Sequence, residues 1–392
     1  MPQIPVLRLR RRAVDPIRRG HPWVWRDAVE RSEGHPTTGD EVRIAAEDGA
    51  ILGRALYDAD APIAARVHTL GDVPLDTRHL TARLSQAFAR RRALLADEGT
   101  TALRLLHGEG DRIPGFVVDR YGDVAVLRTD GEAARVRVPW LARALVPALE
   151  RIGVRTLVHR LPSRGQAPEL ALLAGPAPPE TTIVREHGVP MHVDLLRGQK
   201  TGAFLDQREN RRRVGRMARG ARVLNLFSYS GGFSLHAALG GAARVTSVDV
   251  AGAAHASAQM SFRAAGVDAG AHEFVTADAF AFLEDAARRG RAWDLVVSDP
   301  PSFAASERAL PKAMAAYRRL HRLCASVLAP SGTLCAASCS SHVAEGAFLA
   351  TLDDASLGRA DLSVVDVFGP PEDHPVPASF PEGRYLKFVV LR

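Results

Sequence analysis

From residue 222 onward, short apolar runs alternate with stretches in which apolar residues recur at helical spacing. This alternation predicts an α/β domain whose parallel strands form a doubly wound sheet. The expected strands lie at 223–227, 244–249, 272–276, 293–298 and 332–338, with helices between them. Two further strands are expected at 362–368 and 385–391.

The first 75 residues follow a different pattern, in which short β-rich runs are separated by turn residues. Strands at such short intervals are typical of a small β-barrel or an open sheet. The expected strands lie at 23–25, 39–44, 51–57 and 64–68.

Residues 76–180 predict a connecting helix, with Asp76 or Thr77 available as its N-cap, followed by a small α+β domain. A glycine-rich turn at 108–115 lacks the Gly-Lys-Ser/Thr of a phosphate-binding loop, so we interpret it as a hairpin connection. The run Gly-Pro-Ala-Pro-Pro at 175–179 has the composition of a linker. These patterns divide the chain into domains at 1–75, 76–180 and 181–392.

Composition and charge predict where the protein resides and what class of partner it binds. Apolar residues make up 46% of the chain, and no apolar run approaches the roughly 18 residues of a membrane span, so we expect a cytoplasmic protein. The formal net charge is +7, with eight arginines in 1–31 and seven in 206–222. One such cluster usually forms a solvated face, but two in one chain favour a track for the phosphates of a nucleic acid.

The three cysteines argue against a disulfide framework, because their number is small and odd. Their spacing contains no Cys-x-x-Cys pair, so we expect no metal site, although His321 or His342 could contribute to one. Cys324 lies in a helical pattern and Cys335 lies inside a predicted strand, so both are expected in the core.

Polar residues gather where the predicted strands end: a turn at 228–232, then Asp249, Asp278 and Asp299 after successive strands. Doubly wound sheets bind ligands at this edge, and Asp249 stands near the offset at which a carboxylate binds a ribose. One carboxylate alone could be a helix cap, but the set together indicates a ligand site. The loop 198–211, in which Asp206 is the expected helix N-cap, is suited to covering that ligand.

These motifs resemble those of the class I S-adenosylmethionine-dependent methyltransferases. With 204–211, 338–342 and 380–387, the segments 225–233 (NLFSYSGGF) and 299–303 (DPPSF) resemble the bacterial large-subunit rRNA cytosine-5 methyltransferases. The start of the chain, including 20–25 (GHPWVW), resembles a PUA domain, a small RNA-binding β-barrel. The resemblance covers essentially the whole chain and implies S-adenosylmethionine as cofactor and large-subunit rRNA as partner; a homodimer is left open.

The resemblance also implies a role for individual residues. Asp249 would bind the cofactor ribose, Asp278 with Ala279 or Phe280 would contact the adenine, and the 228–232 loop would pass under the methionine portion. The residues expected to bind the cofactor are Lys200, Phe204, Asp206, Gln207, Asn225, Phe227, Ser228, Tyr229, Gly231, Asp249, Asp278, Ala279, Phe280 and Asp299.

Methylation of carbon 5 of a pyrimidine requires a cysteine, because that carbon becomes nucleophilic only after a thiolate adds to carbon 6. Cys339 lies just past a predicted strand, beside the DPPSF segment, and is the expected nucleophile. Asp299 is expected to hold the base edge, and Phe303 either stacks on the base or packs in the core. The candidates for the general base are Glu382, Lys387 and His374.

One departure from the family pattern concerns the base. Many RNA cytosine-5 methylases carry a second cysteine after the proline of the fourth motif, where this chain has Ser302. An arrangement with one cysteine is shared with uracil-5 methyltransferases, so cytosine and uracil both stay open. The alternatives are methylation of another base or of an exocyclic nitrogen, and an RNA-binding ribosome-assembly factor without catalysis.

Overall fold

The computed structural model describes residues 4–161, 169–198, 200–304 and 306–392. The chain forms two compact units, each assembled from segments that are distant in sequence. The first contains Met1–Thr182, Leu195–Ala203 and Glu372–Gly383, and the second contains Ile183–Asp194, Phe204–Pro371 and Arg384–Arg392. The separate domains predicted at 1–75 and 76–180 fall inside the first unit, and their independence stays a prediction. No helix among the described residues is long and apolar enough to cross a membrane.

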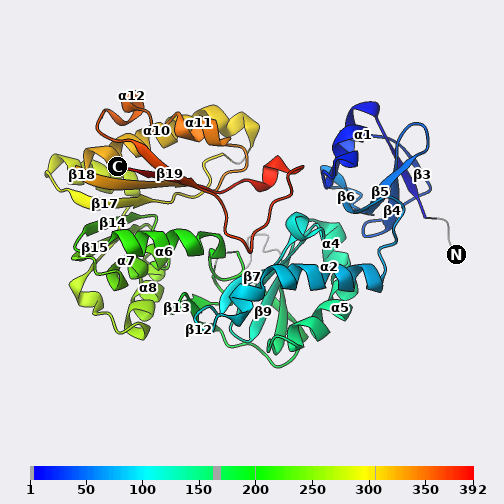
Figure 1. The fold of residues 1–392 in the computed structure, drawn as a ribbon, viewed down its shortest axis with the longest axis horizontal. Coiled ribbons are helices and arrows are strands. Elements are labelled where there is room, and N and C mark those ends of the chain that lie inside the picture. Colours follow the sequence, from blue (N-terminus) through cyan, green and yellow to red (C-terminus); the bar gives the residue numbers. More distant parts are fainter. Residues whose placement is uncertain (1–3, 162–168, 199, 305) are drawn as a thin grey trace. The chain divides into compact units, whose positions relative to one another are not determined.

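The N-terminal part of the first unit is a six-stranded sheet in the order β2-β6-β5-β4-β1-β3, accompanied by one helix (Figure 1). Strands β2, β4, β5 and β6 match the predicted runs, whereas β1, α1 and β3 were not predicted. The first strand has only four residues, and most side chains of β3 are exposed, so neither shows a clear apolar pattern. The bounds are β1 (Val6–Leu9), α1 (Arg11–Arg18), β2 (Trp23–Trp25), β3 (Val29–Glu33), β4 (Glu41–Ala45), β5 (Ile51–Tyr57) and β6 (Ile63–Leu70).

A five-stranded sheet in the order β11-β10-β9-β8-β7, with helices α2 to α5, completes most of the first unit. Asp76 is confirmed as the N-cap of α2, because its carboxylate accepts a hydrogen bond from the backbone N–H of His79. The turn at 108–115 joins the antiparallel strands β7 and β8, so its interpretation as a hairpin connection is confirmed. The bounds are α2 (Thr77–Arg90), α3 (Arg92–Ala96), β7 (Ala102–His107), β8 (Phe116–Tyr121), β9 (Val124–Thr129), α4 (Glu132–Val136), α5 (Val138–Glu150), β10 (Thr156–Arg160) and β11 (Leu170–Ala174).

The second unit contains a seven-stranded sheet in the order β16-β15-β14-β17-β18-β20-β19, preceded in sequence by the hairpin β12-β13. Strands β14 to β18 are parallel, and β20 and β19 continue the sheet in antiparallel fashion. The predicted doubly wound sheet is confirmed. The bounds are β12 (Thr181–Glu186), β13 (Val189–Asp194), α6 (Arg208–Met217), β14 (Arg222–Leu226), α7 (Gly232–Leu239), β15 (Arg244–Asp249), α8 (Gly252–Ala264), β16 (Glu273–Thr276), α9 (Ala279–Arg288), β17 (Trp293–Ser298), α10 (Leu310–Ser326), β18 (Leu328–Ser338), α11 (Glu345–Leu349), α12 (Asp354–Leu357), β19 (Val364–Phe368) and β20 (Lys387–Leu391).

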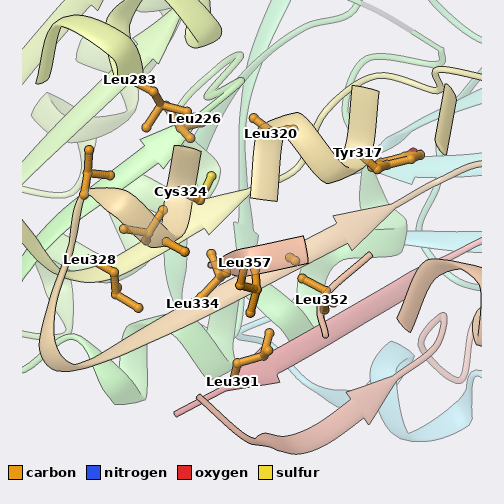
Figure 2. Packing of buried hydrophobic residues seen from close by; sticks show 14 of the residues in the cluster. Leu226, Leu283, Tyr317, Leu320, Cys324, Leu328, Leu334, Leu352, Leu357 and Leu391 are labelled. Atoms are coloured by element: carbon orange, nitrogen blue, oxygen red, sulfur yellow. The ribbon is translucent and has the colours of Figure 1, made fainter. Parts of the chain in front are cut away.

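Strands β14, β15, β17 and β20 of this sheet are buried at most positions because both of their faces are covered, whereas β19 is largely exposed. Alternate residues enter two different cores. Val297 and Cys335 pack on the side of α6 and α7, and Val296 and Leu334 pack on the side of α9 and α10. Figure 2 shows the second of these cores, where Tyr317, Leu320 and Cys324 of α10 meet strand residues and the C-terminal strand. The two packed faces hold the strand ends in place, and these ends form the candidate site.

Candidate active site

The strand order of the second unit reverses between β14 and β17, which are direct neighbours. Crevices at such a switch point, at the carboxyl ends of the strands, are where open α/β sheets bind ligands. The loop after β14 begins at Phe227, and the loop after β17 begins at Asp299. Two of the predicted motifs therefore meet at this edge, with β18 and its Cys339 one strand further along the sheet.

The loop after β14 has an unusual backbone that Asp249 supports. Phe227 and Tyr229 have φ values of 55° and 45°, which are uncommon for residues with a side chain. Asp249 Oδ2 accepts a hydrogen bond from the Tyr229 backbone N–H at 2.8 Å, and Oδ1 accepts one from the Ala251 N–H at 2.8 Å. Backbone strain of this kind is found at ligand sites and is retained where the surroundings enforce it.

The glycines of this loop have packing reasons of their own. Gly231 has a φ of 75°, and a Cβ atom there would lie 2.6 Å from Ala258 Cβ. A Cβ atom on Gly232 would lie 2.7 Å from Arg211 Cδ. Helices α8 and α6 therefore require glycine at these two positions. The close approach of a ligand to Gly231 stays a prediction.

Two buried polar atoms, one on β14 and one in the loop that follows it, have no hydrogen-bond partner within the described part of the chain. They are Asn225 Oδ1 and Ser228 Oγ. The amide nitrogen of Asn225 donates to Ser234 Oγ at 2.9 Å, and Ser234 Oγ lies 2.7 Å from Ser247 Oγ, so the Asn225 side chain is fixed in orientation. Unsatisfied buried polar atoms are rare in folded proteins. Their presence at the end of β14 fits a polar ligand that would satisfy them.

The other predicted adenine and ribose residues lie on neighbouring strand ends. Asp278 is exposed and caps α9, because its Oδ1 accepts a hydrogen bond from the Ala281 N–H at 3.0 Å. Ala279 is buried, whereas Phe280 is partly buried, with the Arg319 guanidinium 4.9 Å from its ring centre. The capping role that we considered for a single carboxylate is therefore real for Asp278, and its predicted contact with adenine stays a prediction.

The segment 204–207 packs against the β14 loop. The Phe204 ring meets the Tyr229 ring edge-on, with centroids 5.5 Å apart, and Asp206 Oδ2 accepts a hydrogen bond from the Tyr385 hydroxyl at 2.8 Å. The prediction of Asp206 as a helix N-cap is wrong. Residues Leu205–Gln207 form a 3₁₀ turn, and Gln207 occupies the N-cap position of α6 without a capping hydrogen bond from its side chain. Lys200, also predicted here, belongs to the first unit and has a φ of 54°.

A buried ion pair that was not predicted supports this segment. The Arg211 guanidinium donates to both carboxylate oxygens of Glu186, at 2.8 and 2.6 Å, and also to the Phe204 carbonyl at 3.0 Å. Glu186 and Arg211 are buried, and so is Arg208. The predicted phosphate track over 206–222 is therefore wrong for Arg208 and Arg211, because both point into the protein. A sequence pattern cannot distinguish an arginine that faces solvent from one paired inside.

Cys339 is the first residue of the loop after β18, and it is partly exposed. Its Sγ lies 4.0 Å from the Pro300 carbonyl oxygen, and Ser340 Oγ donates to the Ala304 carbonyl at 3.3 Å, so the loops after β17 and β18 are in contact. Cys324 and Cys335 are fully buried, as predicted, and burial raises the pKa of each thiol to about 12. Cys339 thus differs from both other cysteines in position and exposure.

Tyr317 of α10 lies beneath these loops. Its hydroxyl donates to Ser338 Oγ at 2.9 Å, and its ring lies 4.9 Å from that of Phe303. Burial raises the pKa of Tyr317 to about 12, and the charges of Cys339 and Asp299 add to this effect. The same phenol therefore interacts with both predicted catalytic residues, which places Asp299 and Cys339 in one neighbourhood. Phe303 packs on this core, and stacking on a base stays a prediction.

The three candidates for a general base lie in different surroundings. His374 is buried beside Asp373, with Nδ1 and Oδ1 3.0 Å apart, and Glu382 lies 3.3 Å from His21. Both belong to the first unit. Lys387 opens β20 in the second unit, is 3% exposed, and interacts electrostatically with Cys339. Of the three, Lys387 is the residue that the structure brings to the cysteine.

Family comparisons agree with this geometry. Residues 141–380 match the model of a family described as S-adenosylmethionine-dependent methyltransferase, and residues 7–70 match that of a PUA-like domain. Proteins named Ribosomal RNA large subunit methyltransferase I are 35% identical in Aeromonas salmonicida and Photobacterium profundum and 34% identical in Vibrio cholerae. These alignments cover 95% of this chain and 95 or 96% of each relative.

Solved structures share the whole fold. A chain from Streptococcus mutans, provisionally assigned as an S-adenosylmethionine-dependent methyltransferase, is 25% identical with a TM-score of 0.87, over 99% of this chain and all of that one. A second solved chain, provisionally assigned as a methyltransferase and bound to SAH, is 24% identical with a TM-score of 0.88 over the same 99%. The second similarity shows the fold alone.

Proposed function

The chain belongs to the S-adenosylmethionine-dependent methyltransferase family, and on that basis we propose that it forms 5-methylcytosine in large-subunit ribosomal RNA, with Cys339 as nucleophile. The relatives whose alignments cover more than nine-tenths of this chain are named as methyltransferases of large-subunit ribosomal RNA. The PUA-like match at 7–70 supports RNA as the partner. The choice of carbon 5 of cytosine rests on the position of the cysteine and on the family resemblance.

The residues at the end of β14 fit the cofactor. S-adenosylmethionine carries an amino group, a carboxylate and a ribose, and it supplies an electrophilic methyl group on its sulfonium. Asn225 Oδ1 and Ser228 Oγ are buried acceptors that lack a partner among the described residues, and they fit the donors of the methionine portion. Asp249 is fixed by two backbone N–H groups and is assigned to the ribose hydroxyls.

Cys339 and Asp299 would carry out the acceptor chemistry. The Cys339 thiolate adds to carbon 6 of the cytosine, so that carbon 5 becomes nucleophilic enough to accept the methyl group. Loss of the proton from carbon 5 and expulsion of Cys339 then restore the aromatic ring and the thiolate. Asp299 would hold the exocyclic amine of the base, on a wall stiffened by Pro300 and Pro301. A paired base must leave its stack to reach these side chains.

The first unit offers a surface for the RNA backbone. Helix α1 and its flanks carry five exposed arginines, Arg10, Arg11, Arg12, Arg18 and Arg19. Nearby, Arg12 forms an ion pair with Asp27 at 2.6 Å, two residues from the exposed Trp25. Exposed cations bind phosphates and an exposed aromatic ring stacks on a base, so these side chains suit single-stranded RNA.

One observation carries the proposal. Cys339 is the partly exposed cysteine of the three, and its sulfur lies 4.0 Å from the backbone of the DPPSF segment that contains Asp299. A structural thiol would be expected in the core, where Cys324 and Cys335 lie.

The test is covalent trapping. We expect purified protein, incubated with S-adenosylmethionine and large-subunit rRNA that contains 5-fluorocytidine, to form an adduct through Cys339. Fluorine at carbon 5 prevents the last elimination, so the adduct accumulates and peptide mass spectrometry locates it. Methylation of unmodified rRNA without any trapped adduct would exclude the carbon-5 mechanism. RNA that contains 5-fluorouridine tests the second candidate, uracil, which the single-cysteine arrangement with Ser302 leaves open.

A further inference from the structure

Lys387 is a lysine inside the protein, with a side chain that reaches the loop carrying Cys339. It is 3% exposed, and its ammonium group donates hydrogen bonds to the carbonyl oxygens of Ser340, at 2.6 Å, and Val343, at 2.7 Å. In the antiparallel ladder between β18 and β20, Lys387 stands opposite Ser338, the residue before Cys339. The lysine therefore determines the course of the chain on the C-terminal side of the cysteine.

Burial of this ammonium group is costly unless another group compensates for its charge. No carboxylate forms a salt bridge with Lys387 among the residues that the structure describes. The groups that interact with its charge are Cys339 and, on α11, Glu345. On β19, the other neighbour of β20, the titratable residue is Asp366, which is exposed and pairs in register with Val390. The groups that can compensate for the charge of Lys387 therefore lie on the side of β18, and not on the side of β19.

Cys339 needs a positive charge nearby if it is to act as a thiolate. Asp299 and Tyr317 lie in its neighbourhood, and a carboxylate close to a sulfur disfavours the thiolate. The nucleophile of the proposed reaction is nevertheless a thiolate, so the site needs a nearby cation to stabilise it. Lys387 meets that need from the adjacent strand.

We propose that Lys387 is the positioning residue and proton partner of Cys339: its two hydrogen bonds fix the 340–343 loop, and in its neutral form its amine takes the thiol proton to leave an ammonium–thiolate pair. In that step the S–H bond breaks and an N–H bond forms, so no further reactant is needed. This inference rests on the proposed function, because it explains how its nucleophile is activated.

The titration of Lys387 agrees with this geometry. Burial lowers the pKa of Lys387 to about 8, although the interactions with Cys339 and Glu345 oppose that change. A lysine that titrates near 8 can exchange a proton with a thiol, whose ordinary pKa is about 8.5, whereas an exposed lysine near 10.4 would remain protonated.

The test is the pH dependence of Cys339 alkylation by iodoacetamide on the full chain, with peptide mass spectrometry to separate Cys339 from the buried Cys324 and Cys335. In the wild type we expect a midpoint at least about one pH unit below the ordinary 8.5 of a thiol. In Lys387→Met the midpoint rises by about one unit or more, which makes alkylation at pH 7 roughly tenfold slower. Lys387→Arg keeps a cation that stabilises the thiolate and keeps fast alkylation at pH 7, with the thiol proton passing to solvent because a guanidinium cannot accept it.

Lys312→Met is the matched control, because Lys312 is exposed on α10 and should leave the midpoint unchanged. S-adenosylmethionine binding reports whether each variant is folded. If Lys387→Met does not fold, the wild type still decides, since a wild-type midpoint at or above 8.5 would overturn the proposal. An unchanged midpoint in a folded Lys387→Met would also overturn it. Alkylation uses no RNA, so failure of the proposed function would appear separately, in the trapping experiment.

Discussion

The loop after β14 and the loops after β17 and β18 lie at the same edge of one sheet, but they hold their groups in different ways. The first, which we call the donor half, is a continuous run around 225–233 whose backbone is held by hydrogen bonds from the Ser228 N–H to the Val248 carbonyl and from the Tyr229 N–H to Asp249. The second, the acceptor half, combines Asp299, Cys339 and Lys387 from three separate segments. The donor half relies on backbone shape, and the acceptor half relies on individual side chains.

This difference sets the expected sensitivity of each half to substitution. A backbone loop supported at several points loses part of its binding energy when one support is removed. A nucleophile has no substitute, so its removal eliminates one route of reaction altogether. Substitutions in the acceptor half should therefore reduce the rate of methyl transfer, and those in the donor half should weaken cofactor binding or the fold.

The largest effect is expected for Cys339→Ala. Methyl transfer to rRNA should fall by roughly 10⁴-fold or more, because loss of a nucleophile removes the covalent route. S-adenosylmethionine affinity should stay within about twofold, since the donor half is intact. Single-turnover transfer of a labelled methyl group and calorimetric binding measure the two quantities.

Cys335→Ala is the matched control, four positions earlier on β18 and buried. It should lower stability through the cavity it creates and leave the rate per folded molecule unchanged. Full activity of Cys339→Ala would contradict the acceptor half as we describe it and would favour transfer to an exocyclic nitrogen, which needs no thiolate.

The next effect concerns the fold beneath the donor half. Arg211→Met should destabilise the second unit by about 3–5 kcal/mol, because Glu186 would be left buried without its partner. Hydrogen exchange of β14 and α6, followed by mass spectrometry, locates the loss. Arg212→Met is the neighbouring control, since Arg212 is exposed and should change the exchange little. Equal exchange in both variants would show that the buried pair does not support the donor half.

The two halves also differ in how well the sequence predicted them. The donor half is a contiguous motif followed by aspartates at strand ends. Because the apolar strands of a doubly wound sheet give a strong sequence pattern, both the strands and the loops that form the site could be predicted. The roles of Arg211 and Tyr385 could not, because their partners Glu186 and Asp206 are 25 and 179 residues away. Local sequence patterns cannot predict pairs of residues that lie so far apart in the chain.

In the acceptor half, the sequence likewise could not show which of several candidate residues lies near the nucleophile. Cys339 was predicted from reaction chemistry, whereas Lys387, His374 and Glu382 were equivalent candidates in sequence. Only folding separates them, because the segment Glu372–Gly383 joins the first unit while β20 returns to the second. Asp206 was misassigned for a related reason: a 3₁₀ turn before α6 moves the helix start to Arg208.

A smaller effect should follow Asp249→Asn in the donor half. The amide keeps the size of the side chain but loses its charge and one of its two acceptor oxygens, so only one of the hydrogen bonds from the Tyr229 and Ala251 N–H groups can be kept. We expect roughly tenfold weaker S-adenosylmethionine binding, as for a loss of about 1.5 kcal/mol, with methyl transfer retained at saturating cofactor. Asp268→Asn is the control, because Asp268 makes a comparable backbone contact to Gly270 away from the site. Unchanged affinity in Asp249→Asn would remove Asp249 from the ribose site.

The smallest effect is a pH-dependent one at Glu209, next to the buried pair that supports the donor half. The hydrogen bond from His187 lowers the pKa of Glu209 to about 2, with further contributions from the charges of His187 and Arg208 and opposed by burial. A carboxylate whose pKa is lowered by folding stabilises the protein above its ordinary value near 4.5, and this contribution is lost as the pH falls towards 2. Glu209→Gln should therefore cost about 1 kcal/mol at pH 7 and progressively less below pH 4.5, as followed by hydrogen exchange of α6. The exposed Glu98 supplies the control Glu98→Gln, which should show no such convergence. A destabilisation of Glu209→Gln that stays constant from pH 7 to pH 3 would show that shape, and not charge, is what Glu209 contributes beside the donor half.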